Sequence, residues 1–269
     1  MKTDVDTDKV EEIIRHVAAT EVMPRFKNLS DGDIREKKPG DFVTVADEAS
    51  ERLFSQLLSE LLPGSLVVGE EAVSKDQDVL KKFSEDRPVW VIDPIDGTYN
   101  FSHGRSKFGI LIALVRNGVT EYGWAFDAPG NRMAAAGKGV GAFLDGKRLK
   151  ITDAEKSLKD IVLQGGGAQA WHFDPIRSVF KDIINLRCSL HDFMNFLTGD
   201  ADAIVHVNKA TPWDHAANVL LAEEFGAYVR MGDGRAYDPA YYGQGYILAA
   251  QNEKIWHKIH AATYETLKK

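Results

Sequence analysis

Apolar residues recur at helical spacing near the start of the chain and predict two amphipathic helices. The first covers residues 8–28, where apolar side chains fall three and four positions apart. The second emerges from a loop that begins at residue 35, and Pro63 and Gly64 end it. The segment SLVVGEE follows directly and is typical of a buried strand that ends in acidic residues.

The middle of the chain has the shorter period of β-strands. Residues 85–150 contain apolar runs joined by Asn117-Gly118 and by Asp145-Gly146, dipeptides typical of tight hairpin turns. Strands joined by such turns run antiparallel, so this region is predicted to form a largely antiparallel sheet.

Beyond about residue 150, helical and extended segments alternate. The pattern predicts helices near 175–185, 189–198, 213–225 and 252–268, and strands at 161–165, 203–207, 227–230 and 246–250. Alternation of this kind is typical of α/β folds. We therefore expect an N-terminal α+β part over 1–150 and a C-terminal α/β part over 151–269, packed tightly because the connections are short.

Composition and charge narrow the class of protein. The 269 residues are 44% hydrophobic and 27% charged, which is ordinary for a globular protein. A net charge of −7 without a long Lys/Arg run argues against nucleic acid as a partner. The start of the chain is polar, and the most apolar run, residues 108–115, is too short to span a bilayer. The single cysteine, Cys188, excludes an internal disulfide, so we expect a cytoplasmic protein without a membrane partner.

Acidic residues stand at the ends of four apolar elements instead of on a polar face. They are Asp47, Glu70 with Glu71, Asp93 with Asp96, and Asp214. Taken singly, Asp47 and Asp214 are explained as acids that complement a helix N-terminus, and Glu70 as part of a solvated strand end. The motif DPIDGT at 93–98 is different, because two carboxylates follow a run that is predicted to be buried.

Carboxylates gathered below the surface point to a bound cation. Clusters of carboxylate and carbonyl oxygens prefer hard ions, so Mg²⁺ is expected, with Mn²⁺ or Ca²⁺ as substitutes. Two Mg²⁺ ions suit in-line displacement at phosphorus. Gly97 and Thr98 lie where a helical turn is predicted to start, so their N–H groups are candidates for binding phosphate. The Thr98 hydroxyl is a candidate for holding the attacking water.

Two glycine-rich segments do not fit nucleotide-binding motifs. Residues 137–142 imitate a dinucleotide loop but lie between predicted hairpin strands. Residues 165–169 follow a strand but lack the lysine and the Ser/Thr of a P-loop, and we expect them to form either a mobile loop or a loop at the edge of the substrate site. Cys188 is expected to be a small buried residue and not a nucleophile.

Three blocks of residues stand in an order and spacing shared with one known family. They are GEE (69–71), DPIDGTYNF (93–101) and WDHAAN (213–218). Together with VTVADEASE (43–51), they resemble the inositol monophosphatase family of magnesium-dependent, lithium-sensitive phosphatases. The resemblance implies a layered αβαβα sandwich and a homodimer that acts on a small phosphorylated substrate.

The resemblance also implies a set of metal ligands. The matching positions are Glu70, Asp93 and the carbonyl of Ile95 for a first, water-activating Mg²⁺, and Asp93, Asp96 and Asp214 for a second. Glu70 and Asp47 resemble the outer ligands of a third, loosely held ion.

Catalytic and binding roles are implied in the same way. Thr98, with Glu70 and Asp47, resembles the catalytic group that orients the attacking water, and Gly97 with Thr98 resembles the phosphate-binding backbone. Asp96 and Asp214 resemble substrate contacts as well as metal ligands. The segment at 37–39 resembles a flexible loop that closes over the site.

The segments that would recognise the substrate depart from the family pattern. Where relatives that act on inositol phosphates carry glycine and alanine, this chain has RCSLHD, which places Arg187, Ser189 and His191 near the expected substrate hydroxyls. The acidic residue that precedes the WD block in the family is missing near Val207. Arg187 either faces a second anionic group or pairs with an acid in the core, and the sequence leaves both readings open.

The expected activity is hydrolysis of inositol monophosphate, or of a related polyol or sugar phosphate, by a metal-activated water. Fructose 1,6-bisphosphate, histidinol phosphate and 3′-phosphoadenosine nucleotides are alternative substrates within the same family. A non-catalytic interaction scaffold with this fold, and a protein that merely buffers cations, are alternatives from other classes.

Overall fold

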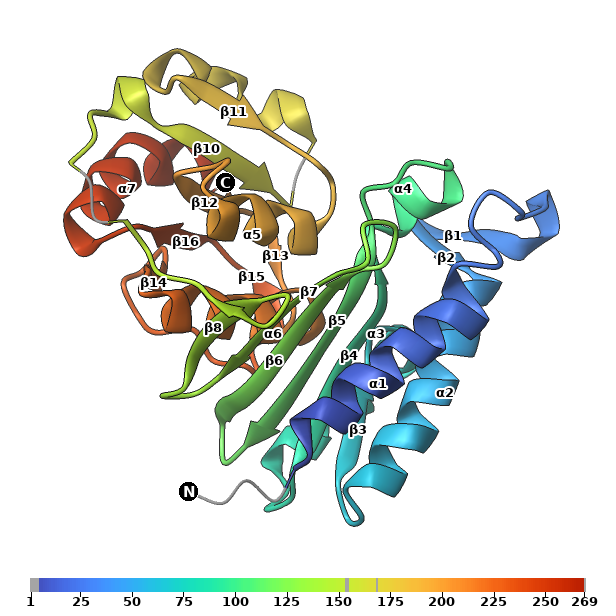
Figure 1. Cartoon of the computed structure of the whole chain (residues 1–269). Helices are drawn as coiled ribbons and strands as arrows, with labels where there is room; N and C mark the ends of the chain where they lie inside the picture. The colour runs from blue at the N-terminus through green and yellow to red at the C-terminus, as the bar shows by residue number, and fades with distance from the viewer. Residues whose placement is uncertain (1–4, 153–154, 168, 269) are drawn as a thin grey trace.

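Two large sheets and three helical layers alternate through the molecule (Figure 1). The computed structural model describes residues 5–152, 155–167 and 169–268. Helices α1 and α2 cover the outer face of the larger sheet, α5 and α6 lie between the sheets, and α7 packs on the far side of the smaller sheet. This order of layers confirms the predicted αβαβα sandwich.

The helices lie close to the segments with helical periodicity. They are α1 (Thr7–Val17), α2 (Val45–Leu61), α3 (Glu70–Lys75), α4 (Thr98–Ser102), α5 (Ser189–Thr198), α6 (Pro212–Phe225) and α7 (Glu253–Leu267). Short 3-10 segments cover Asp31–Asp33, Gln77–Ser84, Leu158–Asp160 and Ala170–Val179. The helix predicted for residues 8–28 ends early: α1 passes into a π-helical turn over Ala18–Val22, and Pro24 follows, which cannot continue the hydrogen-bond ladder.

The larger sheet contains seven strands in the order β3-β4-β5-β6-β7-β8-β9. Their bounds are β3 (Leu66–Gly69), β4 (Val89–Asp96), β5 (Gly109–Arg116), β6 (Val119–Asp127), β7 (Arg132–Gly137), β8 (Gly141–Leu144) and β9 (Lys147–Arg148). β3 pairs with β4 in parallel, and the later neighbours pair antiparallel. Asn117-Gly118 and Asp145-Gly146 form the predicted tight turns, with positive φ at both residues of each pair.

The smaller sheet contains five strands in the order β11-β10-β12-β16-β14. Their bounds are β10 (Val162–Gly166), β11 (Asp182–Ile184), β12 (Ala203–His206), β14 (Tyr228–Met231) and β16 (Ile247–Ala250). The helix predicted near 175–185 is wrong. A 3-10 segment with Pro175 inside it stops at Val179, and a short strand follows.

Two short strand pairs lie outside the large sheets. They are β1 (Ile34–Lys38) with β2 (Asp41–Thr44), and β13 (Lys209–Ala210) with β15 (Gly243–Gln244). The segment at 35–40, predicted as a loop, is therefore a hairpin whose second strand leads directly into α2.

The middle layer is buried on both sides. Ten of the 14 residues of α6 are buried, because one face packs on the larger sheet through Ala217 and Leu220 and the other on the smaller sheet through Val219 and Ala222. Such a helix needs apolar residues all round, which explains why its sequence lacks a clear polar stripe.

Helix α6 and strand β6 approach closely because both carry small residues. A Cβ atom built on Gly123 would lie 2.9 Å from the Cα atom and 3.0 Å from the carbonyl oxygen of Ala217. The small side chain of Ala217 and the missing side chain of Gly123 together allow this close approach. The contact fixes the height of α6 above the sheet, and with it the position of Asp214 in the first turn of the helix.

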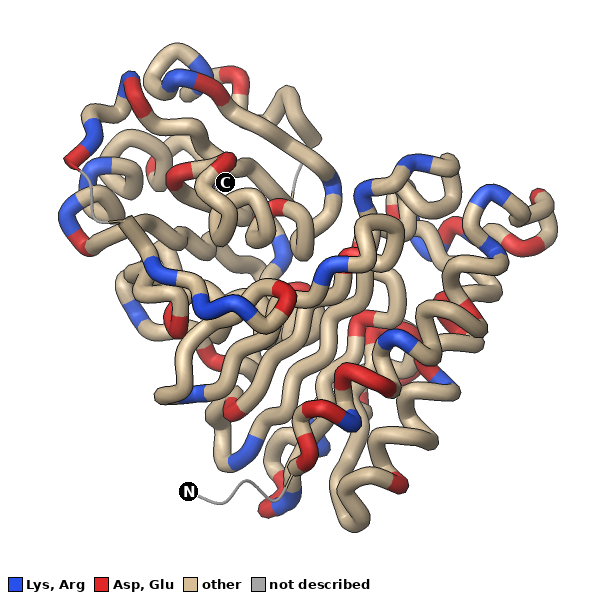
Figure 2. Tube along the Cα trace, viewed as in Figure 1, with Lys and Arg blue, Asp and Glu red and all other residues tan. Residues whose placement is uncertain are grey.

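Charged residues of both signs are spread along the chain. In Figure 2, Lys and Arg positions alternate with Asp and Glu positions over most elements in view, instead of gathering on one of them. Among the helices that the structure describes, none is long and apolar enough to cross a membrane.

The contact between Gly123 and Ala217 predicts a measurable cost of substitution. We expect Gly123→Ala to lower the free energy of unfolding by about 1–3 kcal/mol, because the new methyl group must displace backbone atoms of α6. Gly32→Ala is the matched control, since a Cβ there meets nothing within 4 Å, and its change should stay within about 0.5 kcal/mol. Urea denaturation measures both; equal stability of the two variants would contradict the packing argument.

Candidate active site

The main cavity, of about 430 Å³, opens between the β1–β2 hairpin, the carboxyl end of β4 and the first turns of α5 and α6. Four of the predicted acidic side chains line it: Glu70, Asp93, Asp96 and Asp214. Residues from distant parts of the sequence thus lie together in this cavity.

A bulge in β4 turns Asp93 and Asp96 toward the same cavity. In a regular strand, residues three apart face opposite sides of the sheet. Here Asp93 pairs with Leu111 and Asp96 with Gly109, so the step of three residues on β4 matches a step of two on β5. Pro94 lies inside the bulge, where its missing N–H breaks no ladder bond. Both carboxylates are buried, at 1% and 6% exposure, so the DPIDGT motif is not an exposed surface turn.

Asp96 also caps the N-terminus of α5. Its carboxylate oxygens accept hydrogen bonds from the backbone N–H groups of Ser189, at 3.1 Å, and Leu190, and the Cys188 thiol lies 3.3 Å away. Burial raises the pKa of Asp96 to about 7, with Asp214 contributing, while these donors partly offset the shift. Cys188 is buried as predicted and serves as a packing and hydrogen-bonding neighbour of Asp96.

Asp214 completes a group of three carboxylates. It lies in the first turn of α6, where the side chain of Thr211, the residue before the helix, donates a hydrogen bond to it. Oxygen atoms of Asp93, Asp96 and Asp214 all lie within 4.8 Å of one another, a spacing that suits shared coordination of a metal ion.

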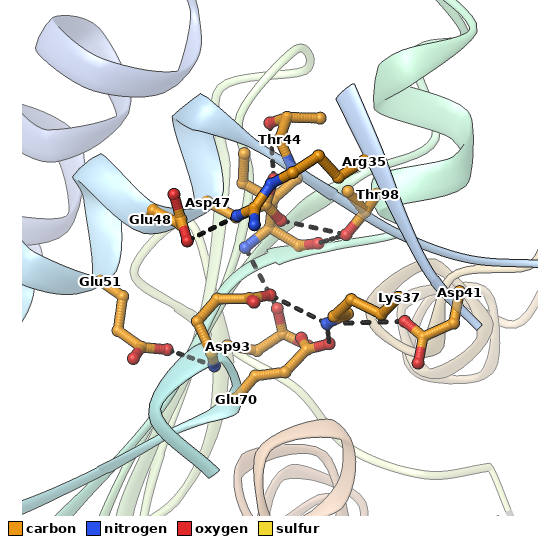
Figure 3. A network of polar contacts seen from close by, with 12 residues as sticks. Arg35, Lys37, Asp41, Thr44, Asp47, Glu48, Glu51, Glu70, Asp93 and Thr98 are labelled. Carbon is orange, nitrogen blue, oxygen red and sulfur yellow. Dashed lines mark hydrogen bonds and ion pairs between the residues drawn. The ribbon is translucent and has the colours of Figure 1, made fainter. Parts of the chain in front are cut away.

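Asp47 joins the site through Thr98. One Asp47 oxygen accepts hydrogen bonds from the backbone N–H and the hydroxyl of Thr44, at 2.8 and 2.6 Å, and forms the capping box of α2. The other oxygen lies 3.1 Å from the Thr98 hydroxyl, which is also 2.8 Å from the carbonyl oxygen of Ile95 (Figure 3). Burial raises the pKa of Asp47 to about 7. The Asp47 carboxylate therefore both caps α2 and contacts Thr98, so the two interpretations of this residue are compatible.

Glu70 forms an ion pair with Lys37, which lies in a segment that was predicted to be a loop. Lys37, on β1, brings its ammonium nitrogen to 2.9 Å from Glu70, 3.0 Å from Glu71 and 3.5 Å from Asp41 (Figure 3). Burial opposes the charge on Lys37, but the facing carboxylates outweigh it and raise the pKa of the ammonium group. The hairpin that carries Lys37 is thereby tied to the start of α3.

Glu51 fixes α3 from the neighbouring helix. Its two carboxylate oxygens each accept a hydrogen bond of 2.8 Å, from the backbone N–H groups of Glu71 and Ala72. Gly69 makes room for it, because a Cβ there would lie 2.3 Å from the Glu51 carboxyl carbon. No sequence pattern predicted these contacts of Glu51, because they join residues about 20 positions apart in two different helices.

The three central carboxylates lack a protein partner of opposite charge. Over residues 5–152, 155–167 and 169–268, no Lys or Arg forms an ion pair with Asp93, Asp96 or Asp214. Burial, reinforced by Glu70, Asp96 and Asp214, raises the pKa of Asp93 well above its usual range. The arrangement is thus unfavourable for three ionised groups unless a cation from solution joins them.

The predicted substrate contacts are brought together only in part. Arg187 and Ser189 line the cavity. The Ser189 hydroxyl donates to the carbonyl oxygen of Asp214 at 2.8 Å and so ties α5 to α6. His191 does not line the cavity: it is buried with Nε2 3.6 Å from an Asp127 oxygen. The reason is helical geometry, since residues two apart on α5 point in different directions.

Sequence reasoning missed a buried polar chain in the cavity wall, formed by Asp192, His206 and His215. His215 Nε2 lies 3.1 Å from His206 Nδ1, and His206 Nε2 lies 3.0 Å from an Asp192 oxygen. His215 Nδ1 lies 3.3 Å from the Thr211 backbone nitrogen and 3.1 Å from the Thr211 carbonyl oxygen, so either tautomer of the His215 ring has a backbone partner. Burial lowers the pKa of His215 to about 4 and raises the pKa of Asp192 above its usual range. These histidines have no ligand-like spacing, so the sequence offered no signal.

The glycines at 165–167 serve close packing. A Cβ on Gly166 would lie 2.3 Å from His206 Nε2, and one on Gly167 would lie 2.1 Å from the carbonyl oxygen of Val207. Gly165 and Gly166 belong to strand β10 and not to the loop expected over 165–169, whereas Gly167 and Gln169 line the cavity and Ala168 lies outside the described residues.

Comparison with known proteins agrees with this geometry. The inositol monophosphatase family matches residues 5–269. An inositol-1-monophosphatase of Mycobacterium bovis is 31% identical over 244 residues, which cover 86% of this chain and 81% of that protein.

Solved structures share the fold. An inositol monophosphatase of Thermotoga maritima superposes with a TM-score of 0.81 at 24% identity, covering 97% of each chain. An inositol monophosphatase/NADP phosphatase complexed with Mg²⁺ and phosphate gives a TM-score of 0.80 at 21% identity, covering 94% of this chain and 92% of that one. The chain therefore belongs to the inositol monophosphatase family and is a phosphoric monoester hydrolase.

Proposed function

We propose that the chain is a Mg²⁺-dependent phosphomonoesterase that hydrolyses a small polyol or sugar phosphate, such as an inositol monophosphate. The observation that carries the proposal is the group Asp93, Asp96 and Asp214, whose oxygens lie within 4.8 Å of one another without an ion-paired Lys or Arg among the described residues. Membership of the family and the complex of one structural relative with Mg²⁺ and phosphate support the choice of ion.

The donor set fits a hard divalent cation. Every candidate ligand atom is an oxygen, from Glu70, Asp93, Asp96, Asp214 and the carbonyl of Ile95, and all five residues line one cavity. Glu70, Asp93 and the carbonyl of Ile95 would hold one Mg²⁺, and Asp93, Asp96 and Asp214 would hold the other. A third ion would take Glu70 and Asp47 as outer ligands.

Bound Mg²⁺ would supply Lewis acidity for the attacking water and for the phosphoryl oxygens. The chain itself would orient the water through the Thr98 hydroxyl. That hydroxyl has one proton and two acceptors in reach, Asp47 and the Ile95 carbonyl, so it can donate to one of them and accept from a water. With a pKa of about 7, Asp47 is suited to take up a proton through Thr98 near neutral pH.

The phosphate would rest on the turn between β4 and α4. Gly97 and Thr98 line the cavity there. Gly97 has φ +85°, and a Cβ on it would lie 2.8 Å from the Lys107 carbonyl oxygen, so the turn requires glycine. Asp96, Ser189 and Asp214 are the proposed contacts around the phosphate that is hydrolysed, and Arg187 is a proposed contact for a different part of the substrate. The position of His191 removes it from that set.

The alternatives from other classes make different predictions for the same assay. A scaffold would release no phosphate from any ester, and a cation-buffering protein would bind Mg²⁺ without turnover. Family membership and the intact acidic group favour the hydrolase. The homodimer and the cytoplasmic location stay predictions of the sequence.

Removing one central carboxylate tests the site. We expect Asp93→Asn to lower Mg²⁺-dependent phosphate release by at least about a hundredfold, because Asp93 is the ligand that both ions would share. The measurement is phosphate release from inositol 1-phosphate and glycerol 2-phosphate, with and without Mg²⁺, alongside circular dichroism to check the fold.

A buried acid outside the cavity provides the matched control. Asp202 is 7% exposed and accepts hydrogen bonds from Lys156 and the Val162 N–H. Asp202→Asn removes a carboxylate in the same way, but its activity should stay within about twofold of the unmodified chain. Full activity of Asp93→Asn at saturating Mg²⁺ would contradict the proposed metal site.

The raised pKa values of Asp47 and Asp96 predict how Mg²⁺ stabilises the fold. Both values are about 7 in the folded chain, against about 4 for an unfolded chain. Protonation of Asp47 and Asp96 therefore stabilises the metal-free fold. This contribution to stability is fully present below about pH 4 and is lost as the pH rises through about 7. Because Mg²⁺ binds the ionised forms, we expect its effect on Tm, relative to EDTA, to be larger at pH 8 than at pH 5.5 by about 3 °C or more. Equal effects at the two pH values would contradict the assignment of these carboxylates.

A further inference from the structure

Arg187 has a backbone conformation that a side chain normally avoids. Its φ is +57°, in the left-handed region. Residues other than glycine, asparagine and aspartate rarely occupy this region, and such strain gathers at functional sites. Among the non-glycine residues with positive φ that the structure describes, two line the main cavity, Arg187 and Asn208. The strain therefore lies beside the proposed site and not on a remote turn.

The neighbouring helix α4 holds this conformation in place. The side-chain amide of Asn100 donates to the carbonyl oxygen of Leu186 at 2.9 Å and approaches that of Arg187 at 3.4 Å. The adjacent Tyr99 receives the guanidinium group, whose Cζ atom lies 3.5 Å from the ring centroid. Backbone and side chain of Arg187 are thus both anchored by the residues that follow the DPIDGT motif.

Stacking on Tyr99 leaves the hydrogen-bonding capacity of Arg187 unused. A guanidinium lying on an aromatic ring keeps its N–H groups at its edges, where they can form a two-pronged contact with a carboxylate or phosphate. Within the part of the chain that the structure describes, no carboxylate forms an ion pair with Arg187. The reading in which Arg187 pairs with an acid in the core is therefore wrong.

The cavity wall contains a second cation in a similar setting. Lys209 also lines the cavity, with its nitrogen 4.4 Å from the ring centroid of Tyr242 and 5.7 Å from that of Trp213. The Lys and Arg side chains of the lining thus both rest on aromatic rings, while Glu70, Asp96 and Asp214 gather around Asp93. The cavity is divided into an acidic floor, suited to metal ions, and a wall with available positive charge.

We propose that Arg187 forms a second anion-binding subsite, so that the preferred substrate carries a phosphate or carboxylate in addition to the phosphate that is hydrolysed. This inference rests on the proposed function. The scissile phosphate would lie on the acidic floor with the metal ions, and the second anion would meet the edge of the guanidinium at the wall. A cavity of about 430 Å³ is large enough for a small sugar carrying two such groups.

Paired substrates that differ in one anionic group test the subsite. The pairs are fructose 1,6-bisphosphate with fructose 1-phosphate, and 2-phosphoglycerate with glycerol 2-phosphate. We expect kcat/KM with Mg²⁺ to be about tenfold or more higher for the doubly anionic member of at least one pair. A preference within the first pair identifies phosphate as the second anion, and a preference within the second pair identifies carboxylate.

Substitution of Arg187 should remove this preference selectively. Arg187→Met should lower kcat/KM for the doubly anionic substrate by about tenfold or more and leave its singly anionic partner within about twofold. Arg187→Gly should do the same with stability at least equal to that of the unmodified chain, because glycine adopts φ +57° without strain. This variant separates the lost charge from any disturbance of the backbone.

Arg105 is the matched control for the arginine and its ring. Its Cζ atom lies 5.3 Å from the centroid of the same Tyr99 ring, but the side chain is exposed and does not line the cavity. Arg105→Met should therefore keep both the activity and the preference.

Three results would overturn the proposal. The first is the absence of a preference in both pairs. The second is an equal loss of kcat/KM on both members of a pair in Arg187→Met, which would mean that Arg187 binds the scissile phosphate. The third is a loss of the preference in Arg105→Met. Failure of the unmodified chain to hydrolyse inositol 1-phosphate or any of the four substrates with Mg²⁺ would instead overturn the proposed function, and the subsite with it.

Discussion

The electrostatic cost of gathering buried carboxylates governs the architecture of this protein. Asp93, Asp96 and Asp214 lie together without a paired Lys or Arg among the described residues, and desolvation and mutual repulsion both oppose that arrangement. The fold holds them together by rigid means: the bulge in β4 turns two of them to one side, and the close contact of Gly123 with Ala217 sets the helix that carries the third. Stability contributed by the surrounding cores thus offsets a local cost that a cation can relieve.

Helix N-termini lessen that cost in a consistent way. Asp47 and Asp214 lie in the first turns of α2 and α6, Glu70 begins α3, and Asp96 accepts hydrogen bonds from the first N–H groups of α5. Each N-terminus presents partial positive charge, which favours a nearby carboxylate by up to about 1 kcal/mol at an exposed site and about twice that when partly buried. Helix capping and the proposed metal binding are therefore compatible explanations, because one carboxylate can serve both.

Local patterns in the sequence predicted the parts of the structure that depend on neighbours along the chain. The turns at Asn117-Gly118 and Asp145-Gly146 and the layered fold followed from dipeptides, periodicity and family motifs. The errors arose where distant contacts decide. Ion pairs from Lys37 to the start of α3 turn an expected loop into an anchored hairpin, and helix geometry directs His191 away from the cavity. The chain of His206 and His215 depends on residues from separate elements, which periodicity cannot detect.

The helical layer between the sheets has a consequence for how the molecule loses its structure. Helices α5 and α6 contribute side chains to the core of the larger sheet and to that of the smaller sheet. Melting of either sheet would expose the apolar surface of these shared helices and so weaken the other sheet as well. The two halves are thermodynamically linked into one cooperative unit, and the carboxylates proposed to bind Mg²⁺ at their junction are separated only when the entire molecule unfolds.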